Sequence, residues 1–309
     1  MSASFAPALS AAHDAAGAQH YPAGALYMVA TPIGNLADIT LRALHLLQTV
    51  DAVACEDTRH TGALLRSYGI DRAGVALVAV HRHNESEAAQ AVIARLAAGE
   101  RVAYASDAGT PAVSDPGARL AAAVRAAGHA VVPLPGASSI TAALSAAGIV
   151  APGHDDGSFV FAGFLPSKAG ERATVLKALG AQARPVILLE APHRIAELAA
   201  ALAPLGDRPV TMARELTKQF EEIATVPAQG AAAWVAASSQ RSRGEYVVLL
   251  HAAPVAADAV AEEGRRVLAL LLAEKLPLKS AARLAADITG ASRNALYEAG
   301  LAARQSEQD

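Results

Sequence analysis

The 309-residue sequence has a single cysteine, Cys55, and few aromatic residues. One cysteine excludes an intramolecular disulfide and any metal site built from several thiolates, and it is typical of a reducing cytoplasm. Aromatic residues make up 4% of the chain and hydrophobic residues 53%, so Ala, Val and Leu must fill the core. We therefore predict a cytoplasmic protein with closely packed helices.

Positive charge is missing from the beginning of the chain, because no Lys or Arg precedes Arg42. The Ala-rich start thus lacks the basic region of a secretory signal and the arginines of a transit peptide. We predict that residues 1–22 form a disordered tail.

Prolines and glycines interrupt the uncharged stretch from Ala130 to Gly153, which argues against a membrane-spanning helix. A net charge of −3 means that any contact with RNA must be local.

Several familiar motifs are missing as well. Neither G-x-G-x-x-G nor G-x-x-x-x-G-K-[ST] stands at a strand-to-helix junction, which disfavours nicotinamide cofactors and ATP. The sequence also lacks G-x-S-x-G and H-E-x-x-H. His81, His83 and Glu85 are close in sequence, but no third histidine is nearby, so we predict no metal site.

The sequence does contain short apolar runs that alternate with helical patterns. In the first half, five such runs end in polar or glycine-rich loops, at residues 26–30, 52–55, 75–80, 101–105 and 130–134. Alternation of this kind predicts a parallel α/β domain whose loops gather along one edge of the sheet. A second alternating series follows, and its order predicts a mixed sheet.

We therefore predict two α/β domains and a small helical module. The first domain spans residues 23–136 and has the parallel sheet, and the second spans 137–252 and has the mixed sheet. An Ala-rich linker at 252–261 precedes the helical module at 262–303. The basic residues of this module either touch nucleic acid, as in a helix-turn-helix, or occupy a solvated helical cap. They include Lys279, Arg283 and Arg293.

The loop from Ser106 to Gly117 is the most informative segment, because it contains two acids, two prolines and two glycines. Such a composition indicates a binding loop rather than an ordinary turn. Its predicted place is the carboxyl edge of the sheet, where open α/β sheets bind ligands. Carboxylates suit the hydroxyls and amine of an adenosine better than a polyphosphate, as in S-adenosylmethionine. The carboxylates expected at this edge are Asp107, Asp115, Glu56 and Asp57.

Six motifs follow one another along the chain, at residues 31–36, 56–61, 83–85, 106–111, 190–194 and 213–218. Together they resemble the tetrapyrrole methylase superfamily and, within it, bacterial enzymes that methylate the 2′-oxygen of a cytidine in 16S ribosomal RNA. The resemblance covers about residues 24–250 and the helical tail. It implies a homodimer that acts on the small ribosomal subunit, with S-adenosylmethionine in the cleft between the two α/β domains.

The resemblance also implies a set of cofactor-binding residues. They are Thr31, Pro32, Gly34, Asp107, Gly109, Thr110, Pro111, Ser138, Ser139, Ala191 and Ala213. One departure is Ala137, which stands where similar sequences usually have proline and leaves this loop less rigid.

The reaction implied is attack of a ribose 2′-oxygen on a methyl carbon, which needs alignment and an acceptor for the hydroxyl proton. Candidate acceptors are the strand-end residues Glu56, Asp57, His83, Glu85 and Lys218. Because a guanidinium pairs two oxygens at once, RNA phosphates are expected to contact four arginines, Arg59, Arg82, Arg194 and Arg214. Two other functions stay open: carbon methylation of a tetrapyrrole precursor, and a non-catalytic nucleotide-binding or RNA-binding module.

Overall fold

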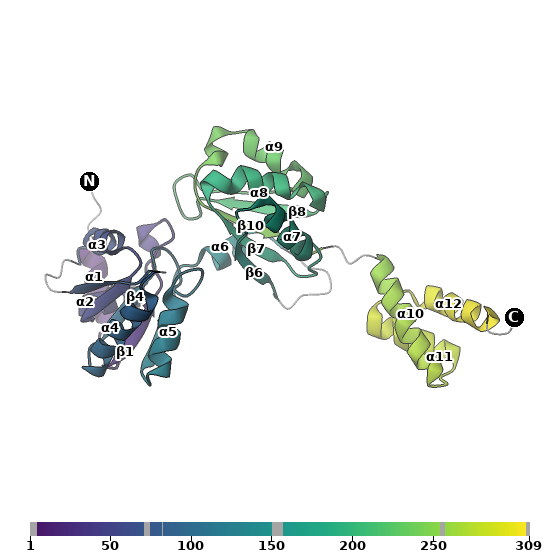
Figure 1. Cartoon of the computed structure of the whole chain (residues 1–309), viewed down its shortest axis with the longest axis horizontal. Coiled ribbons are helices and arrows are strands. Elements are labelled where there is room, and N and C mark those ends of the chain that lie inside the picture. The colour runs from purple at the N-terminus through teal and green to yellow at the C-terminus, as the bar shows by residue number, and fades with distance from the viewer. Residues whose placement is uncertain (1–4, 71–74, 82, 150–156, 254–256, 307–309) are drawn as a thin grey trace.

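The structure is a computed structural model, which describes residues 5–70, 75–81, 83–149, 157–253 and 257–306. Figure 1 shows two α/β domains followed by a separate group of C-terminal helices. Each domain contains one five-stranded sheet. The predicted architecture of two α/β domains and a helical module is confirmed.

The first domain has a wholly parallel sheet in the order β3-β2-β4-β1-β5. Its strands are β1 (Ala25–Val29), β2 (Ala52–Cys55), β3 (Ala76–Ala79), β4 (Val102–Ala105) and β5 (Ala130–Leu134). Every residue of β1, β2 and β4 is buried, as expected for central parallel strands that are covered on both faces. The carboxyl ends of these three strands therefore lie side by side at one edge.

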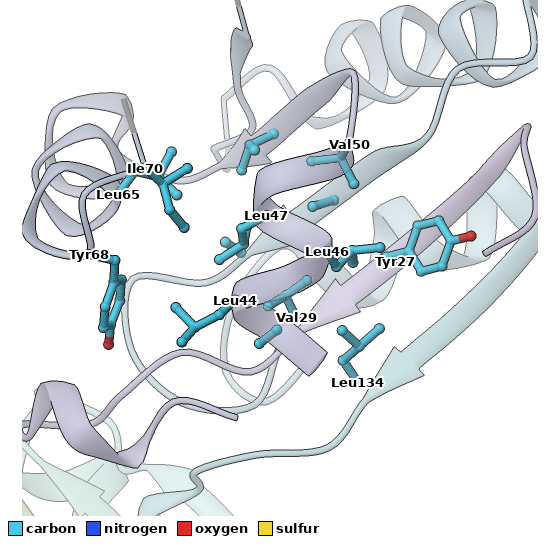
Figure 2. Close-up of a cluster of buried hydrophobic side chains, with 14 of the residues drawn as sticks. Tyr27, Val29, Leu44, Leu46, Leu47, Val50, Leu65, Tyr68, Ile70 and Leu134 are labelled. Atoms are coloured by element: carbon cyan, nitrogen blue, oxygen red, sulfur yellow. The ribbon is translucent and has the colours of Figure 1, made fainter. Parts of the chain in front are cut away.

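Helices cover both faces of this sheet. One face packs against α2 (Leu41–Thr49) and α3 (Thr58–Ser67), and the other against α4 (Glu85–Ala97) and α5 (Gly117–Ala126). Figure 2 shows Leu44, Leu46 and Leu47 of α2 among Val29 and Leu134 of the sheet. The helix begins where Thr40 Oγ1 accepts a hydrogen bond from Ala43 N at 3.1 Å.

The beginning of the chain differs from our prediction of a disordered tail. The helix α1 (Ala6–Ala16) packs on α2, and its Ala12 and Ala16 are buried. The rings of Phe5 and Tyr68 pack in a T-shaped arrangement with their centroids 4.9 Å apart. Alanine has the highest helix propensity, and its small side chain lets two helices approach closely, so an uncharged Ala-rich segment can dock as a helix.

The second domain has a mixed sheet in the order β6-β7-β10-β8-β9, as predicted. Its strands are β6 (Val160–Phe164), β7 (Val186–Glu190), β8 (Pro209–Arg214), β9 (Glu222–Pro227) and β10 (Tyr246–Leu250). Only β6 and β7 pair in parallel, and the other three pairings are antiparallel.

The two faces of the second sheet have different neighbours. One packs against α7 (Ala169–Gly180), α8 (Ile195–Ala201) and α9 (Ala231–Ala236). The other packs against α6 (Ser139–Ala146) and against Ile33 of the first domain. The boundary near residue 136 stays a proposal, supported by the contact of α6 with β10.

The C-terminal module has a small core of its own. Its helices are α10 (Ala257–Ala273), α11 (Leu278–Thr289) and α12 (Arg293–Ser306), so α10 begins inside the segment predicted as a linker. Gly290, with φ of 74°, ends α11 in the left-handed conformation that glycine adopts most easily. Leu268, Leu278 and Leu296 are buried between the helices. Within the described part of the chain, no helix is both long and apolar enough to cross a bilayer.

Candidate active site

A cavity of about 410 Å³ opens where the carboxyl edge of the first sheet meets the second domain. Its volume lies within the range of about 300–1,000 Å³ that is usual for small-molecule sites. The first domain contributes residues that follow three adjacent strands, among them Ile33, Glu56 and Asp107. The second domain contributes residues from β6, β7, β10 and the loop after β8.

Backbone and hydroxyl hydrogen bonds hold the loop after β4 against the loop after β1. Thr31 N donates to Gly109 O at 3.0 Å, and Gly109 N donates to Thr31 O at 3.1 Å. The buried Thr31 Oγ1 donates to Ser106 O at 2.9 Å. Thr31 and Gly109, both predicted as cofactor contacts, thus join the two loops and do not line the cavity themselves.

The next part of the same loop is fixed by Asp115. Its carboxylate accepts hydrogen bonds from Ala112 N at 2.9 Å and from Gly117 N at 2.7 Å. Ala112 and Ser114 have φ of 70° and 67°, a conformation that costs free energy for any residue with a side chain. Asp115 therefore holds a strained loop, of which Ser114 lines the cavity.

Among the predicted acids of the first domain, Glu56 and Asp107 line the cavity, and Asp57 does not. Asp57 N donates to Asp107 Oδ1 at 3.4 Å. The Asp57 carboxylate instead receives two hydrogen bonds from the Arg59 side chain, at 3.2 and 3.1 Å, and one from Arg59 N. These bonds lower the pKa of Asp57 to about 2, which makes it a poor proton acceptor.

Lys218 lines the cavity from the second domain and forms two ion pairs. Its Nζ donates to Glu215 Oε1 at 2.8 Å and to Glu245 Oε2 at 3.0 Å. Burial lowers the pKa of Lys218, but the two carboxylates outweigh it, so the pKa lies above its usual value. Lys218 is consequently protonated, which contradicts its predicted role as a proton acceptor.

At Gly34 the first domain packs closely against the loop after β8 of the second domain. A Cβ at Gly34 would overlap Lys218 Cγ and lie 3.0 Å from the Leu216 carbonyl oxygen. The loop of Glu215 to Lys218 is itself strained, because Glu215 and Thr217 have φ of 52° and 66°. Gly34 therefore lets a strained loop of one domain close onto the other.

Two of the arginines predicted to contact RNA instead form hydrogen bonds and ion pairs inside the second domain. Arg214 is 6% exposed and donates to Phe220 O at 3.0 Å. Arg194 donates to Leu165 O at 2.6 Å and pairs with the buried Glu190 at 3.2 Å. These expectations do not hold in the structure, because both guanidinium groups already pair with internal oxygens. Arg82 lies outside the described residues.

The other predicted residues are divided between the cavity and its surroundings. Ser139 and Ala191 line the cavity. His83 is exposed and outside it, and Glu85 pairs with Arg119. Thr110 Oγ1 donates to Ala137 O at 3.0 Å, which joins the loop after β4 to the loop before α6. The remaining cofactor candidates are not among the lining residues: Pro32, Pro111, Ser138 and Ala213.

Sequence reasoning missed several lining residues of the second domain, namely Phe164, Leu189, Glu190, Leu216, Glu245, Tyr246 and Val247. Phe164 and Glu190 end their strands, a position that signals a sheet edge. Tyr246 begins β10, which is antiparallel to β7. In an antiparallel pair the start of one strand lies beside the end of the other, so Tyr246 reaches the cavity from the start of its strand.

Comparisons with known proteins agree with this fold. The family of Tetrapyrrole (Corrin/Porphyrin) Methylases matches residues 25–232, and the RsmI C-terminal HTH domain matches residues 258–304. A Pseudomonas aeruginosa protein named Ribosomal RNA small subunit methyltransferase I is 48% identical, covering 90% of this chain and 97% of that protein. The protein of that name from Escherichia coli O157:H7 is 46% identical, covering 90% and 95%.

Among solved structures, diphthine synthase is similar with a TM-score of 0.57 and 16% identity, covering 74% of this chain and 90% of that one. The cobalt precorrin-4 methyltransferase CbiF has a TM-score of 0.53 and 18% identity, covering 75% and 98%. At these identities the likeness concerns the fold alone.

The fold is that of an S-adenosylmethionine-dependent methyltransferase, and the family match confirms the predicted class and cofactor. The chain belongs to the tetrapyrrole methylase family.

Proposed function

We propose that the protein methylates the 2′-oxygen of a cytidine in the 16S RNA of the small ribosomal subunit. The observation that carries this proposal is the near-full-length similarity to two ribosomal RNA small subunit methyltransferases. The similarity includes the C-terminal helices, which match a separate domain found with these enzymes. Similarity to enzymes with tetrapyrrole substrates, in contrast, stays at the level of the fold.

The residues of the cavity fit S-adenosylmethionine, which has a positive sulfonium and ammonium and one carboxylate. Four lining residues are acidic, namely Glu56, Asp107, Glu190 and Glu245, and Lys218 is the basic residue among the described lining residues. Asp107 and Glu56 would hold donor groups of the cofactor or of the substrate. The apolar side chains of Ile33, Leu189 and Val247 would exclude water from the adenosine. The bound cofactor supplies an electrophilic methyl group.

The protein must also receive the proton that leaves the 2′-hydroxyl when its oxygen forms the new bond. Of the five predicted acceptors, Glu56 and Lys218 line the cavity. Lys218 is protonated, as its raised pKa indicates. We therefore assign the proton acceptor to the Glu56 carboxylate and a positioning role to the Lys218 ammonium.

The remaining proposals concern the helical module and the assembly. Lys279, Arg283 and Arg293 lie on helices that match a helix-turn-helix domain, and we assign to them contacts with RNA phosphates. The family resemblance supports a homodimer. The free, buried thiol of Cys55 supports a location in the reducing cytoplasm.

The experiment that tests the proposal gives labelled S-adenosylmethionine and the protein either small ribosomal subunits or a tetrapyrrole precursor. We expect label in the RNA, recovered after nuclease digestion as 2′-O-methylcytidine. Label in the tetrapyrrole alone would refute the proposal. Absence of cofactor binding in calorimetry would favour a non-catalytic module.

A further inference from the structure

Phe164 is an exposed aromatic residue at the mouth of the cavity. It ends β6, lines the cavity, and is 53% exposed. Few aromatic residues occur in the chain, and several of the largest, including Tyr27, Tyr104 and Tyr246, are fully or almost fully buried. A large apolar ring left in water next to a binding site suggests a partner that covers it.

A β-bulge turns Phe164 toward the cavity. In the pairing of β6 with β7, Phe161 faces Ile187, but the next aligned residue is Gly163, opposite Leu188. Ala162 is therefore an extra residue, and Phe164 aligns with Leu189. Because side chains alternate along a strand, one extra residue moves every later side chain to the other face.

This change of face decides what Phe164 contacts. Leu189 lines the cavity, so its partner Phe164 stands on the cavity face as well. Without the extra residue, Phe164 would align with Glu190, which is two residues after Leu188 and so on the same sheet face, the face that packs against α8. The bulge therefore places the ring of Phe164 on the sheet face of Leu189 and not on the face of Leu188.

The bulge lies beside the first domain. Gly163 has φ of 66°, a conformation that favours glycine, and a Cβ there would lie 3.5 Å from Ser114 Oγ. Ser114 belongs to the strained loop that Asp115 holds, and both Ser114 and Val113 line the cavity. Two backbone segments with unusual conformations, one from each domain, therefore meet at the mouth where Phe164 is exposed.

We propose that Phe164 stacks on the base of the nucleotide whose ribose is methylated, an inference that rests on the proposed function. A 2′-hydroxyl can enter a cavity between two domains only if its nucleotide leaves the helix, and an extruded base needs a new stacking partner. Aromatic side chains supply such a surface for single-stranded nucleic acid. Glu56 and Asp107 follow strands of the first domain, whereas Phe164 ends a strand of the second, so these carboxylates and the ring line different walls of the cavity.

The test compares substitutions of Phe164 in the full chain, with small ribosomal subunits as substrate. Stacking of one base is worth about 1–3 kcal/mol, so Phe164→Ala should lower kcat/KM for the subunits roughly 5- to 150-fold. Phe164→Trp should keep most of the activity, whereas Phe164→Leu, which is apolar but not aromatic, should behave like Phe164→Ala. The affinity for S-adenosylmethionine, measured by calorimetry, should stay within about twofold in all three variants.

Phe159 provides a matched control. It precedes the other end of β6, is 37% exposed, and is not among the residues that line the cavity. Phe159→Ala should therefore keep the kcat/KM of the wild type. Circular dichroism of each variant identifies any loss that comes from unfolding.

Three results would overturn the inference. Normal activity of Phe164→Ala, or of Phe164→Leu, would show that no ring stacks there. A loss of S-adenosylmethionine affinity in Phe164→Ala would mean that the ring covers the cofactor's adenine. A wild-type protein that binds S-adenosylmethionine but does not label small subunits would refute the proposed function, and the base-stacking role with it.

Discussion

Replacing Gly34 with alanine would put a methyl group into a tight contact between the two domains. The new Cβ would overlap Lys218 Cγ and lie 3.0 Å from the Leu216 carbonyl oxygen. Either the loops separate, at the cost of about 1–3 kcal/mol that is typical of overpacking, or Lys218 swings away. The second route breaks the ion pairs of Lys218 with Glu215 and Glu245.

The loss of stability is set by whichever of these two adjustments costs less free energy. Glu245 is 73% exposed, so solvent screens its ion pair with Lys218, which is worth about 0.2–1 kcal/mol. In the pair with Glu215 the two side chains are only 28% and 20% exposed, so this pair is screened less. We expect Gly34→Ala to lower the free energy of unfolding by roughly 1–2 kcal/mol, as the sum of the broken pairs and a small loop shift. Urea unfolding followed by circular dichroism measures this quantity.

Two further variants separate this mechanism from a general effect of the substitution. Gly170 lies in α7, and a Cβ added there would meet no atom within 4 Å, so Gly170→Ala should be neutral or slightly stabilising. In a Lys218→Ala background the overlapping Cγ is gone, and Gly34→Ala should cost less than in the wild type. An equal cost in both backgrounds would refute the reasoning, because Lys218 would then not be the obstacle.

Three other predictions concern catalysis, the cofactor and pH. Glu56→Gln should lower kcat by about 10²- to 10⁴-fold with little change in cofactor affinity; a near-normal kcat would exclude Glu56 as the proton acceptor. Asp107→Ala should weaken S-adenosylmethionine binding roughly 10- to 150-fold in calorimetry, from the loss of about 1.5–3 kcal/mol, and unchanged affinity would place the cofactor elsewhere. Burial lowers the pKa of His45 and of His251, with smaller contributions from the neighbouring His13 and Arg208, respectively. The unfolded chain therefore binds protons first, so the free energy of unfolding should fall as pH drops through about 6.5, and a flat profile between pH 7 and 5 would contradict this.

The alternation of apolar runs and helical patterns was enough to predict much of the fold. It indicated a parallel sheet followed by a mixed one, and both are present. Because the carboxyl ends of parallel strands share one edge, it also predicted that Glu56 and Asp107 would meet at one site, and both line the cavity. These features depend on local periodicity and on chain direction, which a sequence displays directly.

Local sequence patterns do not predict which partners an arginine side chain has in the folded protein. Arg194 and Arg214 have the residue type and strand-end position of phosphate contacts, yet both pair with internal oxygens. The Ala-rich start was likewise predicted to be disordered, but α1 packs on α2. In each case the outcome depends on a surface that another part of the chain provides, and no pattern near the residue itself encodes that surface.

The sequence by itself determined the order of the elements, the type of each sheet and the acidic edge at Glu56 and Asp107. Only the tertiary structure decided which side chains from the second domain complete the cavity. A single extra residue in β6 reverses the face of Phe164, and the absence of a side chain at Gly34 lets Lys218 reach the same cavity. Both effects arise where distant backbone segments meet, because strand pairing and steric contact are properties of two segments together.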